Sequence, residues 1–355
     1  FLFLNLQEYY RQIENHNLIL KDYINERTPQ NIKIILKICL TLMYHSEKPH
    51  FAIVHEAVEY SKKFKKHSLV NAVLRGILRN KNSIPMNQKN ISSVFKKYCD
   101  EIFSSKKVCE FIYESFFYKP QSFQVSINDK NNSIYERRVS YLETELEDNS
   151  FIQDIGNFEI IHSIKNLYKD KNIIDICAAP GGKSILLDSY GFRVEAIDSS
   201  QRQIEKFTQN IGRLKLNIKI SKKDFLKTNF SSKYNSILLD APCSALGTFR
   251  RNPDVIHKID EKKIKMNQET QIKMIEKSLI LLNKGGVLVY IVCSFHPFET
   301  MGVIDKILQK HKTISIENIQ SNKMIKKENG YFINPHAFKE LGGSDIFFVT
   351  VLKKN

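Results

Sequence analysis

The chain has 355 residues, 42% of them hydrophobic and 26% charged, which is enough for two globular domains with buried cores. Its formal net charge of +16 favours a polyanionic partner such as nucleic acid, although the joint richness in Lys, Asn and Ile also fits a compositional bias. No apolar run reaches the roughly 18 residues that a membrane span needs, and Phe1–Leu6 lacks the pattern of a signal peptide.

Cysteine usage points to an intracellular protein without structural metal. The six cysteines are Cys39, Cys99, Cys109, Cys177, Cys243 and Cys293. None forms a CxxC pair, and no Cys/His cluster has zinc-ligand spacing. We therefore expect free thiols in a reducing cytoplasm, where each cysteine either fills a core or acts as a reagent.

Residues 1–118 have the pattern of a helical domain. Apolar residues recur at helical spacing over 32–43, 52–64 and 68–78, and glycine is almost absent. Lysines and arginines lie between and along these helices at Lys62, Lys63, Lys65, Lys66, Arg75 and Arg79. For any single lysine, a solvated helix face explains the charge as well as an RNA contact does.

Residues 119–162 break this pattern and predict a small connecting subdomain. Lys119-Pro120 ends the helical region, and Phe123–Ile127 alternates like a short strand. A polar turn is expected over Asn128–Asn132, followed by a charged helical piece through Glu147.

From residue 163 to 355 strands alternate with helices. The expected strands are 173–176, 194–197, 217–220, 236–239, 287–292, 314–316 and 346–352, and the expected helices are 184–190, 200–211, 262–282 and 298–309. A turn at Asn283–Gly286 is expected to stop the third of these helices. This alternation predicts an α/β domain with a mainly parallel sheet covered on both faces, and ligands bind such sheets at the carboxyl ends of the strands.

Acidic residues lie at the ends of four consecutive predicted strands. The first strand leads into Asp175-Ile-Cys-Ala-Ala-Pro-Gly-Gly-Lys183, where small residues allow close approach of a ligand to the backbone. Asp198, Asp224 and Asp240 follow the next three strands. One such aspartate is easily a helix cap, but four at neighbouring strand ends indicate a cofactor that contains a nucleoside.

Two cysteines also lie at neighbouring strand ends. Cys243 follows the fourth strand in Asp240-Ala-Pro-Cys-Ser, and Cys293 follows the fifth. A single cysteine there is best explained as core filler, whereas two beside an aspartate favour chemistry.

Three segments resemble the signature motifs of the NOL1/NOP2/Sun family of RNA cytosine-5 methyltransferases: CAAPGGK, DAPCSALGTFRRNPD and VCSFHPFE. The amino-terminal segments VHEAVEYSKKF and VNAVLRGILR are similar to the NusB-like RNA-binding domain. This pairing of domains occurs in bacterial members of the family that modify ribosomal RNA of the small subunit.

The resemblance implies a class I (Rossmann-like) methyltransferase domain, with a seven-stranded sheet and a final antiparallel strand, after an all-α NusB-like domain. It implies that S-adenosyl-L-methionine binds at Cys177, Ala178, Ala179, Pro180, Gly181, Gly182, Lys183, Asp198, Asp224 and Asp240. It also implies that Cys293 attacks the base and that Cys243 assists product release. The expected partner is small-subunit (16S) ribosomal RNA, and the expected enzyme is a cytoplasmic monomer without a metal.

The two cysteines and Asp240 are suited to methyl transfer to cytosine, and two other functions are compatible with the same residues. Thiolate addition to carbon 6 of cytosine makes carbon 5 nucleophilic, and Asp240 is expected to hydrogen-bond the ring edge and stabilise the developing charge. One alternative is a DNA cytosine-5 methyltransferase, in which Cys243 would be the nucleophile. The other is a non-catalytic RNA-binding or ribosome-assembly factor on the same fold.

Overall fold

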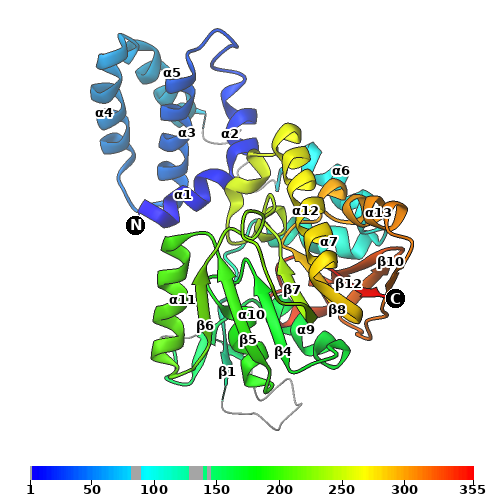
Figure 1. The fold of residues 1–355 in the computed structure, drawn as a ribbon. Helices are drawn as coiled ribbons and strands as arrows, with labels where there is room; N and C mark the ends of the chain where they lie inside the picture. Colours follow the sequence, from blue (N-terminus) through cyan, green and yellow to red (C-terminus); the bar gives the residue numbers. More distant parts are fainter. Residues whose placement is uncertain (1, 81–88, 128–138, 142–144) are drawn as a thin grey trace. The chain divides into compact units, whose positions relative to one another are not determined.

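The computed structural model describes residues 2–80, 89–127, 139–141 and 145–355 (Figure 1). Their contacts divide the chain into two compact units, Phe1–Lys97 with Asn252–Lys258, and Tyr98–Arg251 with Ile259–Asn355. The division at residues 118 and 162 that the sequence pattern favours remains a prediction. Within the described ranges, no helix has the length and hydropathy needed to cross a bilayer.

The first unit is helical, as predicted. Among its helices are α1 (Leu2–Arg11), α2 (Ile13–Leu20), α3 (Gln30–His45), α4 (His50–Ser61), the short η1 (Lys62–Phe64), α5 (His67–Arg79) and, in its second segment, the short η5 (Pro253–His257). Apolar side chains at helical spacing form its core, among them Leu36 and Leu40 of α3 and Val70 and Leu74 of α5. Burial of one apolar face on each helix explains why the periodicity located α3, α4 and α5 correctly.

A small antiparallel sheet follows the helices α6 (Ser93–Ile102) and α7 (Lys106–Ser115). Its order is β2-β1-β3, with β1 at Phe123–Ser126, β2 at Val139–Tyr141 and β3 at Ser150–Ile152. The predicted strand at 123–127 is thus confirmed. The helix expected up to Glu147 is wrong where the chain is described, because Val139–Tyr141 pairs with β1. The turn expected at Asn128–Asn132 lies outside the described residues.

The large sheet confirms the predicted α/β fold class. Its strands are β4 (Asn172–Ile176), β5 (Arg193–Asp198), β6 (Lys219–Lys222), β7 (Tyr234–Asp240), β8 (Leu282–Val292), β9 (Ile314–Ile316), β10 (Met324–Lys327), β11 (Gly330–Ile333) and β12 (Phe348–Lys354). The order is β10-β11-β12-β8-β7-β4-β5-β6, and β9 also pairs with β12. The strands from β6 to β8 are parallel, and β12 is antiparallel to β8.

Two details of the sheet differ from the expectation. The described sheet has nine strands rather than seven, because β10 extends β11 as a hairpin and the short β9 pairs with the far end of β12. The expected turn at Asn283–Gly286 lies inside β8, which starts directly after the preceding helix ends at Leu281. The pairing of β7 with β8 shifts register at this point, so the glycines sit in an irregular stretch of strand.

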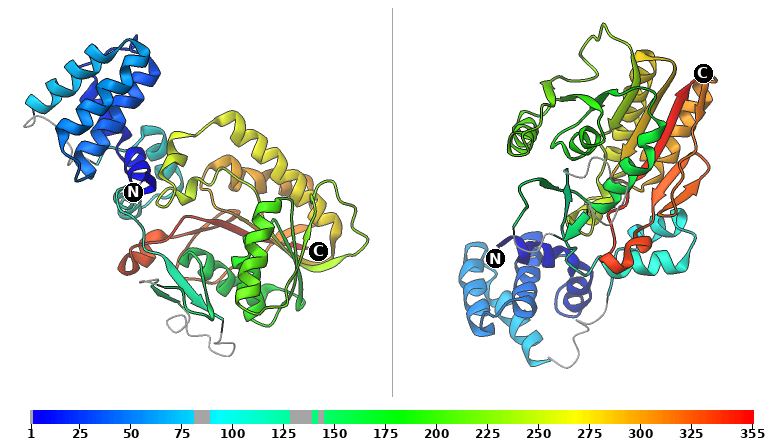
Figure 2. Two further views of the ribbon diagram at one scale, coloured as in Figure 1. Left: turned by 90° about the vertical axis from the view of Figure 1, so that its left-hand side faces the viewer. Right: turned by 90° about the horizontal axis from the view of Figure 1, so that it is seen from below.

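Helices cover both faces of the sheet (Figures 1 and 2). They are α9 (Ile155–Ile164), α10 (Gly182–Ser189), α11 (Gln201–Arg213), α12 (Glu261–Leu281) and α13 (Met301–Lys310). Helix α9 packs against α10, and α12 packs against α13. Because β4, β5, β6, β7 and β8 run in parallel, their carboxyl ends meet at one edge, where the predicted site residues lie.

Candidate active site

The loop after β4 is shaped by unusual backbone conformations. Cys177 adopts a left-handed φ of 61°, and Gly181 has a φ of 108° just before α10 begins at Gly182. A side chain on either glycine would also collide. A Cβ at Gly181 would lie 2.8 Å from the Phe207 ring, and one at Gly182 would lie 2.2 Å from Gln153 Oε1. Glycine is therefore required at Gly181, where the positive φ and the Phe207 ring both exclude a side chain, whereas a side chain at Gly182 would only displace the end of the Gln153 side chain.

Asp198, the last residue of β5, is tied to this loop. Its Oδ2 accepts from the backbone N–H of Ala179 at 3.1 Å, and its Oδ1 accepts from the N–H of Ser200 at 2.8 Å. The helix cap of α11 is Ser200, whose side chain accepts from Gln203. Each carboxylate oxygen of Asp198 thus keeps acceptor capacity for another donor, such as a ribose hydroxyl.

Asp224 lies two residues beyond β6, at the same edge of the sheet. Its Oδ1 accepts from the backbone N–H groups of Leu226 and Lys227, and its Oδ2 lies 3.5 Å from Lys227 Nζ. The described contacts are those of a turn residue, and its half-exposed carboxylate remains accessible.

Lys183 and Asp240 form an ion pair between α10 and the end of β7. The Lys183 Nζ lies 2.7 Å from Asp240 Oδ2, and the lysine side chain is only 10% exposed. Burial opposes the ammonium charge, but the carboxylate of Asp240 more than compensates, and the pKa of Lys183 is raised. The pair therefore places a fixed positive charge next to a carboxylate at the sheet edge.

The two predicted reactive cysteines are brought together. Cys243 Sγ lies 3.4 Å from Cys293 Sγ, although the residues come from loops after different strands, β7 and β8. The hydrogen bond with Cys293, together with burial and nearby negative charge, raises the pKa of the Cys243 thiol well above its usual range. Cys243 Sγ thus lies in direct contact with the sulfur of Cys293.

The loop that carries Cys243 is fixed from two other segments. The Gly247 N–H donates to Cys293 O at 2.9 Å, and the Ile346 N–H donates to Gly247 O at 3.0 Å. A Cβ on Gly247 would lie 1.9 Å from Ile346 O, so only glycine fits here. Ala245 adopts a left-handed φ of 58° that turns the chain back after Cys243. The site is therefore built by three segments that are distant in sequence.

Sequence reasoning missed several residues of this site. Gln153 reaches from the segment after β3 to the loop at Gly182. Glu299 is fully buried and bonds the Cys243 loop, and Gln271 of α12 does the same from the other side. The signals were polar residues in apolar surroundings, such as Glu299 within Phe-His-Pro-Phe-Glu, but their partners depend on the tertiary fold.

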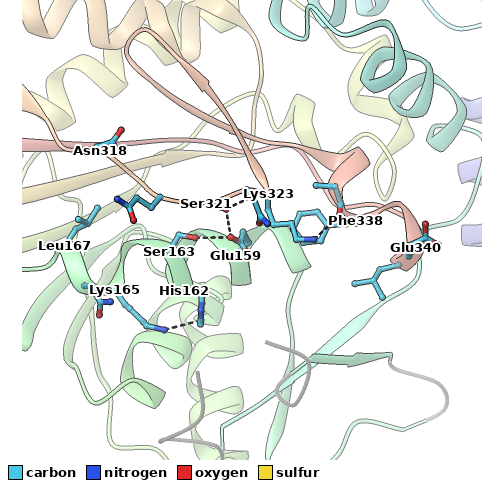
Figure 3. A pocket seen from close by; sticks show the side chains of 15 residues that line it. Glu159, His162, Ser163, Lys165, Leu167, Asn318, Ser321, Lys323, Phe338 and Glu340 are labelled. Carbon is cyan, nitrogen blue, oxygen red and sulfur yellow. Dashed lines mark hydrogen bonds between the residues drawn. The ribbon is translucent and has the colours of Figure 1, made fainter. Parts of the chain in front are cut away.

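A separate pocket of about 1040 Å³ lies away from the thiols, between α9, residues 318–323 and the short helix η7 at Pro335–Leu341 (Figure 3). Glu159 Oε1 accepts from Ser163 Oγ at 2.9 Å and from Ser321 Oγ at 2.6 Å there. None of the predicted site residues lines this pocket. It therefore plays no part in the site described here.

Solved structures show the class of protein. A methyltransferase homolog protein from Pyrococcus horikoshii matches with a TM-score of 0.54 at 21% identity, covering 74% of this chain and 100% of that one. NSun6 from Pyrococcus horikoshii, solved with SFG, matches with a TM-score of 0.51 at 26% identity, covering 61% of this chain and 59% of that one. The second unit thus has the class I methyltransferase fold.

Sequence comparison then gives the family. The model for the 16S rRNA methyltransferase RsmB/F family matches residues 163–353, and the NusB family model matches residues 6–79. The chain belongs to the RsmB/F family, which confirms the resemblance seen in its motifs. The Ribosomal RNA small subunit methyltransferase B of Photorhabdus laumondii is 31% identical over 208 residues, which are 57% of this chain and 46% of that protein. The chain thus spans about half the length of this curated relative.

The residues present fit S-adenosylmethionine, the methyl donor of this class. Carboxylates with spare acceptor capacity stand at the ends of β5 and β7, and Asp224 stands beyond β6. The loop has no room for a side chain at Gly181, and its backbone leads directly into the start of α10. Hydroxyl, amino and carboxylate groups of the donor would find complementary partners on this edge.

Proposed function

We propose that the chain transfers a methyl group from S-adenosylmethionine to carbon 5 of a cytosine in RNA, most specifically in small-subunit (16S) ribosomal RNA. The observation that carries the proposal is the 3.4 Å approach of the Cys243 and Cys293 thiols. A pair of reactive thiols in contact is what a mechanism with covalent attack and assisted release requires. The RNA target rests on the RsmB/F family and on the relative named above.

The residues at the carboxyl edge of the sheet would bind the methyl donor, attack the base and stabilise its charge. The loop Cys177–Lys183, with Asp198, Asp224 and Asp240, would hold the methyl donor, whose sulfonium supplies an electrophilic methyl group. Cys293 would attack carbon 6 of the cytosine, so that the electron density of the ring double bond moves to carbon 5. Asp240 would hydrogen-bond the base near its ring nitrogen, with Lys183 fixing the carboxylate at 2.7 Å.

Cys243 would serve the second half of the reaction. Once carbon 5 carries both the new methyl group and its original proton, that proton must leave. Removal of the proton, by Cys243 directly or through a water, re-forms the double bond and expels Cys293 as a thiolate. The base must be unstacked to reach these groups, which favours a cytosine in a loop or a partly opened helix.

The experiment measures methyl transfer from labelled S-adenosylmethionine to unmodified small-subunit ribosomal RNA, with Cys293→Ala and Cys243→Ala in parallel. We expect 5-methylcytosine with the unchanged protein, none with Cys293→Ala, and a trapped covalent RNA adduct with Cys243→Ala. A trapped adduct with Cys293→Ala instead would indicate the alternative in which Cys243 is the nucleophile. Cofactor binding without transfer to any RNA would favour the non-catalytic assembly factor.

The cytoplasmic location and the monomeric state expected from the sequence are part of this proposal. Neither is needed for the cysteine chemistry. The NusB-like unit would contribute RNA contacts through its lysines and arginines.

A further inference from the structure

The carboxylate of Glu299 lies at the centre of a hydrogen-bond network behind Cys243. Glu299 ends the short helix η6 (Pro297–Glu299) and is fully buried. Its Oε1 accepts from the Ser244 N–H and from Asn267 Nδ2, both at 2.8 Å. Its Oε2 accepts from Ser244 Oγ at 2.5 Å. Two of these three donors belong to the residue next to Cys243.

The other side of Cys243 is held by the same helix that provides Asn267. Gln271 Nε2 of α12 donates to the carbonyl of Pro242 at 2.9 Å, and its side chain is fully buried. Asn267 and Gln271 are four residues apart, so they project from one face of α12. Cys243 is therefore clamped through its two chain neighbours, Pro242 and Ser244.

The network also reaches the nucleophile's loop. Ser244 Oγ lies 3.2 Å from Ser294 Oγ, and Ser294 directly follows Cys293. The backbone of Glu299 is fixed in turn, because Tyr290 of β8 donates its hydroxyl to Glu299 O at 2.8 Å. The residues that follow the two cysteines are thus joined to one buried carboxylate.

A carboxylate is an unfavourable group to bury if its only role is packing. Its desolvation costs several kcal/mol unless donors compensate for it, and an apolar side chain of similar size is often as stable or more so. Here all three described partners of the carboxylate are donors, and two of them belong to Ser244, the residue that follows Cys243. The arrangement is better explained by the placement of Cys243 than by packing.

We propose that Glu299 is a positioning residue that holds the Cys243 thiol against Cys293 for the step that releases the methylated base. This inference rests on the proposed function. In that step the C5–H electron pair forms the C5–C6 double bond, the C6–S pair leaves with Cys293, and the proton passes toward Cys243. Displacement of Cys243 slows this step without preventing the earlier attack by Cys293.

The test is Glu299→Gln, which keeps the shape but replaces one acceptor oxygen with an NH₂ group that cannot accept from Ser244. We expect steady-state turnover to fall on the order of tenfold to a hundredfold, the effect of misplacing a reacting group by about an ångström. We also expect a covalent RNA adduct to accumulate, as with Cys243→Ala, while the first methyl transfer persists. A purely structural defect would lower the rates of both methyl transfer and product release, and no covalent adduct would accumulate.

Glu276→Gln is the matched control. Glu276 lies on α12, the helix that packs against η6, and its carboxylate lies 2.6 Å from Lys310 Nζ, away from the thiols. It should leave turnover and adduct unchanged. If Glu299→Gln does not fold, Asn267→Ala tests the inference in its place. This variant removes one hydrogen-bond donor to the carboxylate and should also increase the amount of covalent adduct. The inference is overturned if a covalent adduct accumulates with Cys243→Ala but with neither Glu299→Gln nor Asn267→Ala. Absence of adduct with Cys243→Ala would count against the proposed function itself.

Discussion

At the residue scale, the four carboxylates at the carboxyl ends of neighbouring strands have different partners. Asp175 is fully buried and accepts from Ser184 Oγ at 2.5 Å, whereas Asp240 pairs with a lysine. Asp198 accepts from the backbone N–H groups of Ala179 in the cofactor loop and of Ser200, and Asp224 accepts from backbone N–H groups of its own turn. Sequence spacing predicted where these residues lie. It could not predict their partners, because these come from other elements of the fold.

Asp175 gives the first prediction at this scale. Burial is the main cause that raises the pKa of its carboxyl to about 7, although the hydrogen bond from Ser184 opposes it. Between about pH 4 and pH 7, Asp175 is therefore protonated in the folded protein and ionised in the unfolded chain. The contribution of this residue to the free energy of unfolding declines as the pH rises through that range. Asp175→Asn should remove the decline and stabilise the protein at pH 8 by a few kcal/mol, since each pKa unit corresponds to about 1.4 kcal/mol.

The measurement is the thermal midpoint of both proteins from pH 4 to pH 8. The difference should be largest at pH 8 and should nearly vanish at pH 4. Asp170→Asn is the control. Hydrogen bonds from the Asn172 N–H and from Asn235 lower the pKa of Asp170, so any pH effect of this substitution should have the opposite sign. A constant gap between Asp175→Asn and the unchanged protein would contradict the prediction.

At the scale of elements, periodicity located most helices and parallel strands but not every pairing. The hairpin of β10 and β11 is absent from the expected elements, because the lysines of β10 mask its alternation. The two residues between its strands are Glu328 and Asn329, and Gly330 begins β11. The helix expected before Glu147 failed where β2 pairs with β1. Long-range pairing decides such short segments, and local pattern does not contain it.

The segment before β12 provides the prediction at this scale. Arg251 Nε donates to Asp345 Oδ2 at 2.8 Å, and its Nη2 bonds the same oxygen. The Asp345 side chain is 1% exposed, and its N–H donates to Asp154. Asp345→Ala should cost about 1 to 3 kcal/mol, the usual range for hydrogen bonds to a charged group, and should loosen the contact of Ile346 with the Cys243 loop.

The readouts are the thermal midpoint and the rate of methyl transfer, both of which should fall. Glu317→Ala is the matched control, because Glu317 pairs with Lys353 at 3.3 Å in a more exposed ion pair that should contribute little. Equal midpoints for the two variants would show that the Arg251–Asp345 pair does not fasten this segment.

At the scale of the whole molecule, the net charge of +16 does not show which lysines and arginines contact RNA. Family assignment of the first unit does not answer this, since it identifies a fold rather than individual contacts. Salt dependence does answer it, because each phosphate contact releases counterions and steepens the fall of affinity with salt.

Lys62, Lys63, Lys65 and Lys66 form an exposed cluster between α4 and α5 of the NusB-like unit. Their joint replacement by Gln should lower affinity for small-subunit ribosomal RNA and should reduce the slope of log affinity against log salt by up to about 0.7 to 0.9 per lost contact. The control replaces the exposed Lys169, Lys171, Lys215 and Lys219, which lie near the amino ends of the parallel strands, opposite the thiols. Both variants lose four charges, so equal changes in slope would mean that overall charge, rather than the α4–α5 cluster, attracts the RNA. A larger change for the first variant would assign RNA contacts to the NusB-like unit.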